Sequence, residues 1–161
     1  MATIYLLLGA NLGDRLSTMQ RAATLVGERV GAVTKGSSVY QTAPWGVEEQ
    51  PAFLNQALAV ETALAPEEVL RHLLDIEYEL GRVRYERWGA RDIDIDMLYY
   101  SDLVMDTARL TLPHPRLHER RFALVPLAEI APDFVHPVLG VDNATLLKQC
   151  PDEGEVGLFS E

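Results

Sequence analysis

The chain has 161 residues, of which 48% are hydrophobic, and its formal net charge at pH 7 is −10. This length suits one hydrophobic core and is too short for two full domains, so we expect a single domain over residues 1–161. The acidic balance excludes a protein that binds nucleic acid through general electrostatic attraction.

The cysteine count and the hydropathy pattern indicate a cytoplasmic protein with no membrane attachment. Cys150 is the only cysteine, which excludes an internal disulfide framework and fits a reducing compartment. No apolar run approaches the roughly 18 residues that a membrane-spanning helix needs. The apolar run at residues 4–8 is too short for a signal-peptide core and has no basic leader.

The first forty residues predict a strand, a helix and a second strand. The apolar run 3–8 is typical of a buried strand, and it ends at a glycine-containing turn. Asp14 or Ser17 could cap the helix that follows, which we expect to run to about Arg29. Residues 33–40 predict the second strand.

The middle of the chain predicts a loop, a third strand and an amphipathic helix. Residues 41–52 contain two prolines and a glycine and predict the loop. Residues 53–62 predict a strand with the candidate core residues Leu54, Leu58 and Val60. The helix begins near Pro66, a residue suited to a first helical turn, and ends at Gly81. Its periodic face comprises Leu70, Leu73, Leu74, Glu77 and Leu80.

The last part predicts a fourth strand over residues 92–100, a possible hairpin partner over 103–112 and a short helix over 122–130. The acidic tail after Pro151 is expected to be loose. The order β-α-β-β-α-β predicts a ferredoxin-like α+β sandwich, in which helices cover one face of an antiparallel sheet.

A cluster of arginines precedes the fourth strand. Eight of the twelve arginines lie between residues 82 and 121, and the tightest group is Arg82, Arg84, Arg87 and Arg91. The planar guanidinium suits bidentate contact with phosphate oxygens. An acidic protein that collects its arginines here is therefore expected to bind an anion there, although an ordinary solvated loop is the alternative.

Three carboxylates follow with the period of a strand. Asp92, Asp94 and Asp96 alternate with Ile93 and Ile95, so the carboxylates share one face. Carboxylates two residues apart lie roughly 6.6 Å apart along a strand. Such a pair can hold one Mg²⁺ or flank two ions about 3.5–4 Å apart. Together with the arginines, the pattern predicts a site for a metal-bound polyphosphate.

Asp92 is left out of the ligand set, because it could equally open the strand or hold an arginine. The chain has no P-loop signature, so side-chain arginines and Mg²⁺ would have to hold a nucleoside triphosphate in place of backbone amides.

The segment RWGARDIDIDML, residues 87–98, resembles the signature of the 6-hydroxymethyl-7,8-dihydropterin pyrophosphokinase family. The agreement covers the chain to about residue 138 and includes, in order, YLLLGANLG at 5–13, YQTAP at 40–44, QPAFLN at 50–55, LPHPR at 112–116 and 120–122. The resemblance implies that pyrophosphate passes from Mg²⁺-ATP to the hydroxymethyl group of the pterin in folate biosynthesis, with AMP as the other product.

The resemblance also implies roles for individual residues. Asp94 and Asp96 match the metal ligands, for which we expect two Mg²⁺ ions, and Arg82 and Arg91 match further catalytic positions. The positions that match the ATP site are Arg84, Arg87, Arg91, Arg109, Thr111, His114 and Arg120. Those that match the pterin site are Thr42, Trp45, Phe53, Asn55, Trp88 and Phe122. We expect ATP and the pterin as partners of a monomer.

Several positions depart from the best-known form of the family. The arginine loop is one residue short, and Tyr85 stands where a lysine is expected. Phe53 and Trp45 replace a tyrosine and a leucine, Pro115 replaces a tyrosine, and Leu74 replaces a polar residue that faces the nucleotide. These departures bear on affinity and loop closure and not on the reaction class.

Other interpretations stay open at this point. The same aspartates could serve a metal-dependent phosphodiesterase or nucleotidyl transferase, or a non-catalytic ferredoxin-like module could use them for a structural ion. His114 could be a structural histidine and Phe122 plain core. Glu77 could reach the nucleotide or belong to a solvated helix face.

Overall fold

The computed structural model describes residues 1–11, 14–42, 53–81 and 93–160. Within these residues the main sheet has six strands. They are β1 (Ala2–Ala10), β2 (Ala32–Gly36), β3 (Tyr40–Thr42), β4 (Phe53–Thr62), β5 (Asp94–Tyr100) and β8 (Val156–Leu158). The order is β5-β1-β4-β3-β8, with β2 also paired to β4, and every pair is antiparallel.

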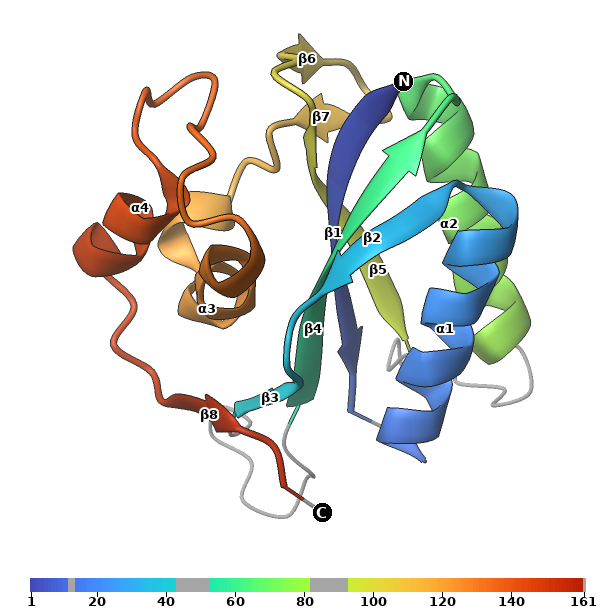
Figure 1. The fold of residues 1–161 in the computed structure, drawn as a ribbon, viewed down its shortest axis with the longest axis horizontal. Coiled ribbons are helices and arrows are strands. Elements are labelled where there is room, and N and C mark those ends of the chain that lie inside the picture. The colour runs from blue at the N-terminus through green and yellow to red at the C-terminus, as the bar shows by residue number, and fades with distance from the viewer. Residues whose placement is uncertain (12–13, 43–52, 82–92, 161) are drawn as a thin grey trace.

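One face of the sheet is covered by α1 (Arg15–Arg29) and α2 (Pro66–Gly81), as Figure 1 shows. The side chain of Asp14 caps α1 by accepting a hydrogen bond from the Ser17 backbone N–H at 3.2 Å, as predicted. α2 also keeps its predicted bounds to within one residue. Its buried side chains Val69, Leu73, Ile76 and Leu80 pack against Leu6, Leu8 and Leu58 of the sheet, whereas Leu74 is exposed.

The opposite face is covered too, which corrects the expectation of helices on one face. There lie α3 (Arg121–Ile130) and α4 (Asn143–Gln149), as Figure 1 shows. The short 3₁₀ helix η2 (Leu117–Glu119) lies with them, because Leu117 is buried in the same cluster. Leu124 and Leu127 of α3 are buried with Leu7 and Leu98 of the sheet. The physical reason is visible in β1, where consecutive leucines at positions 6, 7 and 8 are all buried, as in a strand covered on both faces.

The strand predicted over residues 33–40 is two strands, β2 and β3. Between them, the Ser37 backbone N–H donates to the carbonyl oxygen of Ala57 at 2.9 Å. The Ser37 hydroxyl in turn accepts from the Ala57 backbone N–H at 2.9 Å. A side-chain oxygen therefore takes the place of a backbone carbonyl and ends the regular ladder at this residue.

The segment 103–112 does not extend the sheet beside β5. Its strands β6 (Met105–Asp106) and β7 (Thr111–Leu112) pair with each other. Ser101 turns the chain at the end of β5 with a φ of 46°, and its hydroxyl accepts from the Thr3 backbone N–H at 3.2 Å. The chain therefore leaves the sheet before the short hairpin forms.

The tail after Pro151, expected to be loose, contains β8, which pairs with β3 in the register Tyr40↔Leu158. The Phe159 backbone N–H donates to the carbonyl oxygen of Val39 at 2.9 Å, and the Phe159 ring lies under the Arg15 guanidinium, 5.7 Å from the ring centroid. Among all residues that the structure describes, no helix has the length and apolarity of a transmembrane segment.

Candidate functional site

The aspartate pair lies on β5 with the predicted alternation. Asp94 and Asp96 are half-buried, whereas Ile95 and Met97 are buried against α1 and α2. Leu98, which shares a face with the two aspartates, is buried with residues of α3. The two carboxylates therefore stand on the α3 face of the sheet, beyond the end of the packed core.

The strand register aligns this pair with a predicted pterin residue. Gly9 of β1 pairs with Asp94 on one side and with Asn55 of β4 on the other. Two strand spacings separate Asp94 from Asn55, or about 10 Å between their Cα atoms. Asn55 is on the α3 face, because Leu54 packs against α1 and α2 while Ala57 packs beneath α3. The predicted metal and pterin residues are thus neighbours on one surface.

Gly9 keeps the space between them open. A Cβ atom at this position would lie 2.9 Å from Nδ2 of Asn55. That amide nitrogen is held in place, because it donates to the carbonyl oxygen of Leu8 at 3.2 Å and Asn55 is only 5% exposed. A side chain at position 9 would therefore clash with Asn55 on the surface between the predicted metal residues and the predicted pterin residues.

His114 and Arg120 lie near the same end of β5. The backbone N–H of His114 donates to the carbonyl oxygen of Leu98 at 3.0 Å. Burial lowers the pKa of His114 below its usual value, and Arg120 and Arg116 lower it further while Asp96 opposes them. Because Nδ1 accepts from the Arg116 backbone N–H at 3.2 Å, the neutral ring carries its proton on Nε2.

Two other predicted ATP residues lie on the β6–β7 hairpin. The Thr111 hydroxyl donates to Oδ1 of Asp106 at 3.3 Å, and the exposed Arg109 follows a turn closed by Thr107. Their side chains belong to a different element from the aspartates, so the nucleotide site that the resemblance implies would extend from β5 to this hairpin.

Four of the predicted pterin residues lie on described elements, namely β3, β4 and the start of α3. Phe53, at the start of β4, is 38% exposed and shares a face with Asn55. Thr42 pairs with Phe53, and its Oγ1 is a buried atom with no hydrogen-bond partner in the described part of the chain. Phe122 is half-buried, with the Arg120 guanidinium 5.7 Å from its ring centroid. A buried hydroxyl in need of a partner suits a polar ligand.

Six predicted site residues lie outside the described residues, and their roles stay predictions. They are Trp45, Arg82, Arg84, Arg87, Trp88 and Arg91.

Comparisons with known proteins show the family of the chain. A family model described as 7,8-dihydro-6-hydroxymethylpterin-pyrophosphokinase matches residues 5–132. The chain belongs to this pyrophosphokinase family. A 2-amino-4-hydroxy-6-hydroxymethyldihydropteridine pyrophosphokinase of Aquifex aeolicus is 44% identical over 138 residues, which cover 86% of each chain. The enzyme of that name from Methylorubrum extorquens is 47% identical over 136 residues, covering 84% of this chain and 86% of the relative.

A solved structure supports the fold. The crystal structure of wild-type Plasmodium falciparum HPPK-DHPS aligns with 92% of this chain at a TM-score of 0.77 and 16% sequence identity. The chain spans 44% of the length of that solved chain. The ferredoxin-like α+β arrangement is therefore confirmed as the pyrophosphokinase fold.

Glu77 takes a position that sequence reasoning left open. Its carboxylate oxygen Oε2 accepts a hydrogen bond from the backbone N–H of Ile95 at 2.7 Å, between the two aspartates of this pyrophosphokinase. The sequence could have indicated this bond. Glu77 follows the same helical period as Leu73 and Leu80, and a carboxylate on the buried side of a helix needs a hydrogen-bond partner.

The donor set around Asp94 and Asp96 fits Mg²⁺. Among the described residues, no three or more His, Cys, Asp or Glu side chains gather closely enough to enclose a metal ion. Mg²⁺ in phosphoryl-transfer sites is held by one or two carboxylates, with water and substrate phosphates completing its shell. Two carboxylates on one strand face meet that need, whereas a closed structural zinc site would require four protein ligands.

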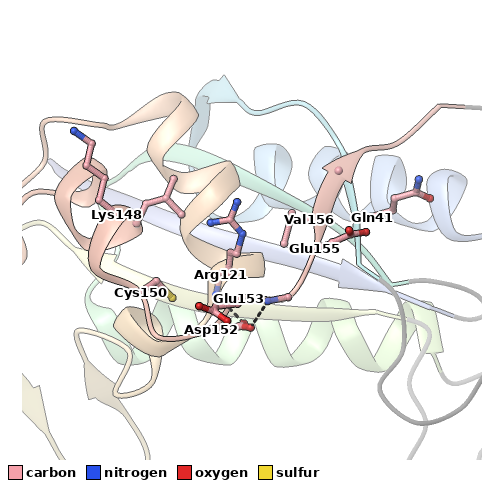
Figure 2. A pocket seen from close by; sticks show the side chains of 11 residues that line it. Gln41, Arg121, Lys148, Cys150, Asp152, Glu153, Glu155 and Val156 are labelled. Atoms are coloured by element: carbon pink, nitrogen blue, oxygen red, sulfur yellow. Dashed lines mark hydrogen bonds between the residues drawn. The ribbon is translucent and has the colours of Figure 1, made fainter.

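A separate pocket of about 930 Å³ lies between β8 and the helices α3 and α4 (Figure 2). Of the predicted site residues that the structure describes, none lines it; its lining includes Gln41, Arg121, Lys148, Cys150, Asp152 and Glu155. The Asp152 carboxylate accepts from the backbone N–H groups of Arg121 at 3.2 Å and Gly154 at 2.8 Å. The bond from Arg121 attaches the tail to the start of α3.

Proposed function

We propose that this protein transfers the pyrophosphoryl group of ATP to the hydroxymethyl group of 6-hydroxymethyl-7,8-dihydropterin, giving AMP and the pterin diphosphate in folate biosynthesis. The observation that carries the proposal is the row Asp94–Gly9–Asn55 across three strands. It sets a carboxylate pair suited to Mg²⁺-ATP about 10 Å from a residue suited to the pterin.

The nucleotide lies on the β5 side in this proposal. Asp94 and Asp96 would hold Mg²⁺, two ions when ATP is bound, and the metal would supply charge neutralisation at the phosphates. His114 is neutral and can donate from Nε2 to a phosphate oxygen. Positive charge comes from Arg109 and Arg120, with Thr111 as a hydroxyl partner, and from the loop arginines Arg82, Arg84, Arg87 and Arg91.

The pterin lies on the β3–β4 side. Phe53 and Phe122 offer aromatic faces for a flat ring to stack on, and Trp45 and Trp88 would complete the lining. Because Nδ2 of Asn55 is bonded to the Leu8 carbonyl oxygen, its Oδ1 is the atom we expect to accept from the pterin amide. The buried Thr42 hydroxyl would gain its hydrogen-bond partner in the same complex.

The reaction needs no covalent link to the protein. The pterin hydroxyl oxygen bonds to the β-phosphorus of ATP as the bond from that phosphorus to the α–β bridging oxygen breaks. AMP leaves, and the hydroxyl proton passes to solvent. Positioning two bound reactants can supply about 7–11 kcal/mol of the barrier reduction. Fixed positive groups at the phosphates supply electrostatic stabilisation.

We propose a cytoplasmic enzyme that acts as a monomer. The single cysteine supports a reducing compartment. In this arrangement one chain supplies both the nucleotide and the pterin residues. Size-exclusion chromatography coupled to light scattering would contradict the monomer if the mass came out at two or more times 17.9 kDa.

The decisive experiment is an AMP-release assay with ATP, Mg²⁺ and the pterin, run with and without EDTA. We expect AMP to form only with the pterin and to stop when EDTA removes the metal. ADP in place of AMP would indicate transfer of the γ-phosphoryl group, and AMP without a pterin diphosphate would indicate a phosphodiesterase. No turnover by folded protein would favour a non-catalytic binding module.

A further inference from the structure

Within the described residues, the strand that carries the aspartates is paired on one side only. β5 is the last strand of the main sheet, with β1 as its partner in the register Gly9↔Asp94 and Leu7↔Asp96. Because N–H directions alternate along an antiparallel strand, the amide of Ile95 points away from β1. A partly buried amide at a sheet edge needs an acceptor from another element.

Glu77 of α2 supplies that acceptor. Its Oε2 lies 2.7 Å from the Ile95 nitrogen, and the side chain is half-buried. A hydrogen bond from a neutral amide to an ionised carboxylate is shorter and stronger than one to a carbonyl. It fixes the backbone at the one residue between Asp94 and Asp96, while the Ile95 side chain is anchored in the core.

The bond acts at the residue that joins the two proposed ligands. Because Asp94 and Asp96 flank Ile95 on one strand, a change in the Ile95 backbone alters the direction of both carboxylates.

We propose that Glu77 is a positioning residue for the divalent cation of the reaction. Its bond to the Ile95 amide holds the carboxylates of Asp94 and Asp96 at a spacing and orientation that let them share the ion. The proposal rests on the proposed function, in which these two aspartates bind Mg²⁺.

The test compares four proteins: wild type, Glu77→Leu, Glu77→Gln and Glu68→Gln. Glu68 is the matched control, because its carboxylate also accepts a backbone hydrogen bond, from Ala65 at 3.2 Å, at the other end of the same helix. Mn²⁺ binding in the presence of α,β-methylene-ATP is measured by electron paramagnetic resonance. Hydrogen exchange of the Ile95 amide is measured by NMR on the same proteins without metal.

We expect Glu77→Leu to weaken Mn²⁺ binding by about 10- to 100-fold, as removal of groups that orient metal ligands does. The Ile95 amide should exchange faster in this variant and at the wild-type rate in Glu68→Gln. Glu77→Gln keeps an acceptor oxygen, so it should lose less Mn²⁺ affinity than Glu77→Leu.

Two results would overturn the proposal. One is wild-type Mn²⁺ affinity in Glu77→Leu, and the other is an equal loss in Glu77→Gln and Glu77→Leu, which would assign the effect to charge alone. An Asp96→Ala variant separates the two levels of inference. If it binds Mn²⁺ like wild type, the metal site itself is misassigned and the proposed function fails with it.

Discussion

The two faces of the central sheet are made by the same strands and do different work. Towards α1 and α2, the strands present Leu6, Leu8, Leu54 and Ile95, which are all buried in one apolar cluster. Towards α3, the neighbouring positions near the strand ends present Gly9, Asn55, Asp94 and Asp96. Successive residues of each strand point to opposite faces, so buried apolar residues alternate with the polar residues of the proposed site. The residues that stabilise the fold and the residues proposed for the chemistry therefore lie on different faces.

The largest expected effect comes from Asp96→Ala. Removing one of the two proposed Mg²⁺ ligands should lower kcat by about 100-fold or more, while the free energy of unfolding stays near that of wild type because the carboxylate is only half-buried. Steady-state AMP release and urea unfolding check the two parts. Asp102→Ala, at an exposed position beyond the end of β5, is the control and should behave like wild type.

Adjacent substitutions on β4 test the separation of the faces directly. Leu54→Ala should cost about 2–5 kcal/mol of unfolding free energy, because it empties part of a packed core. Asn55→Ala should instead raise KM for the pterin and leave KM for ATP nearly unchanged. Denaturant unfolding and steady-state kinetics with each substrate varied in turn measure the two effects. A selective rise in KM for the pterin in Leu54→Ala would contradict the separation of the two faces.

Gly9→Ala tests whether the surface between the predicted metal residues and the predicted pterin residues must stay free of a side chain. The new Cβ would press against Nδ2 of Asn55, so we expect KM for the pterin to rise roughly tenfold, equivalent to about 1.4 kcal/mol. Gly27→Ala is the matched control: it lies within α1, where a Cβ meets nothing closer than Val33 at 3.9 Å. That variant should keep its kinetics and gain about 0.5–1 kcal/mol of stability.

The smallest expected effect is at His136, which is not among the predicted site residues. Burial lowers its pKa, and its Nδ1 accepts from the backbone N–H groups of Val138 and Leu139 at 3.2 and 3.0 Å. A histidine whose folded pKa is lowered contributes stability that is present above its unfolded pKa, about 6.5, and is lost as the pH falls. In His136→Gln, unfolding free energy should therefore decline less steeply between pH 7 and pH 5. Urea unfolding at a series of pH values checks this. If the dependence of unfolding free energy on pH is the same in His136→Gln as in wild type, other groups cause the decline.

Sequence patterns predicted most of the elements, because their signals are local. β4, α2 and the Asp14 cap of α1 follow from period, proline and capping chemistry. The sequence also predicted that Asp94 and Asp96 alternate with buried isoleucines on a strand. What the patterns missed depends on contacts between distant segments: Ser37 with Ala57, β8 with β3, and the Glu77 carboxylate with the Ile95 amide. The alignment of Asp94, Gly9 and Asn55 is of the same kind, because strand register is a tertiary property.

The position of β8 in the sheet has a consequence for biosynthesis. Its partner β3 is made more than a hundred residues earlier in the chain, between β2 and β4. While later segments are still emerging from the ribosome, β1 and β4 can already pair, but the outer edge of β3 has no strand to cover it. Nascent chains therefore carry an unpaired edge beside Thr42 until β8 itself has been synthesised, and this is where we would look for chaperone contacts or strand exchange between chains.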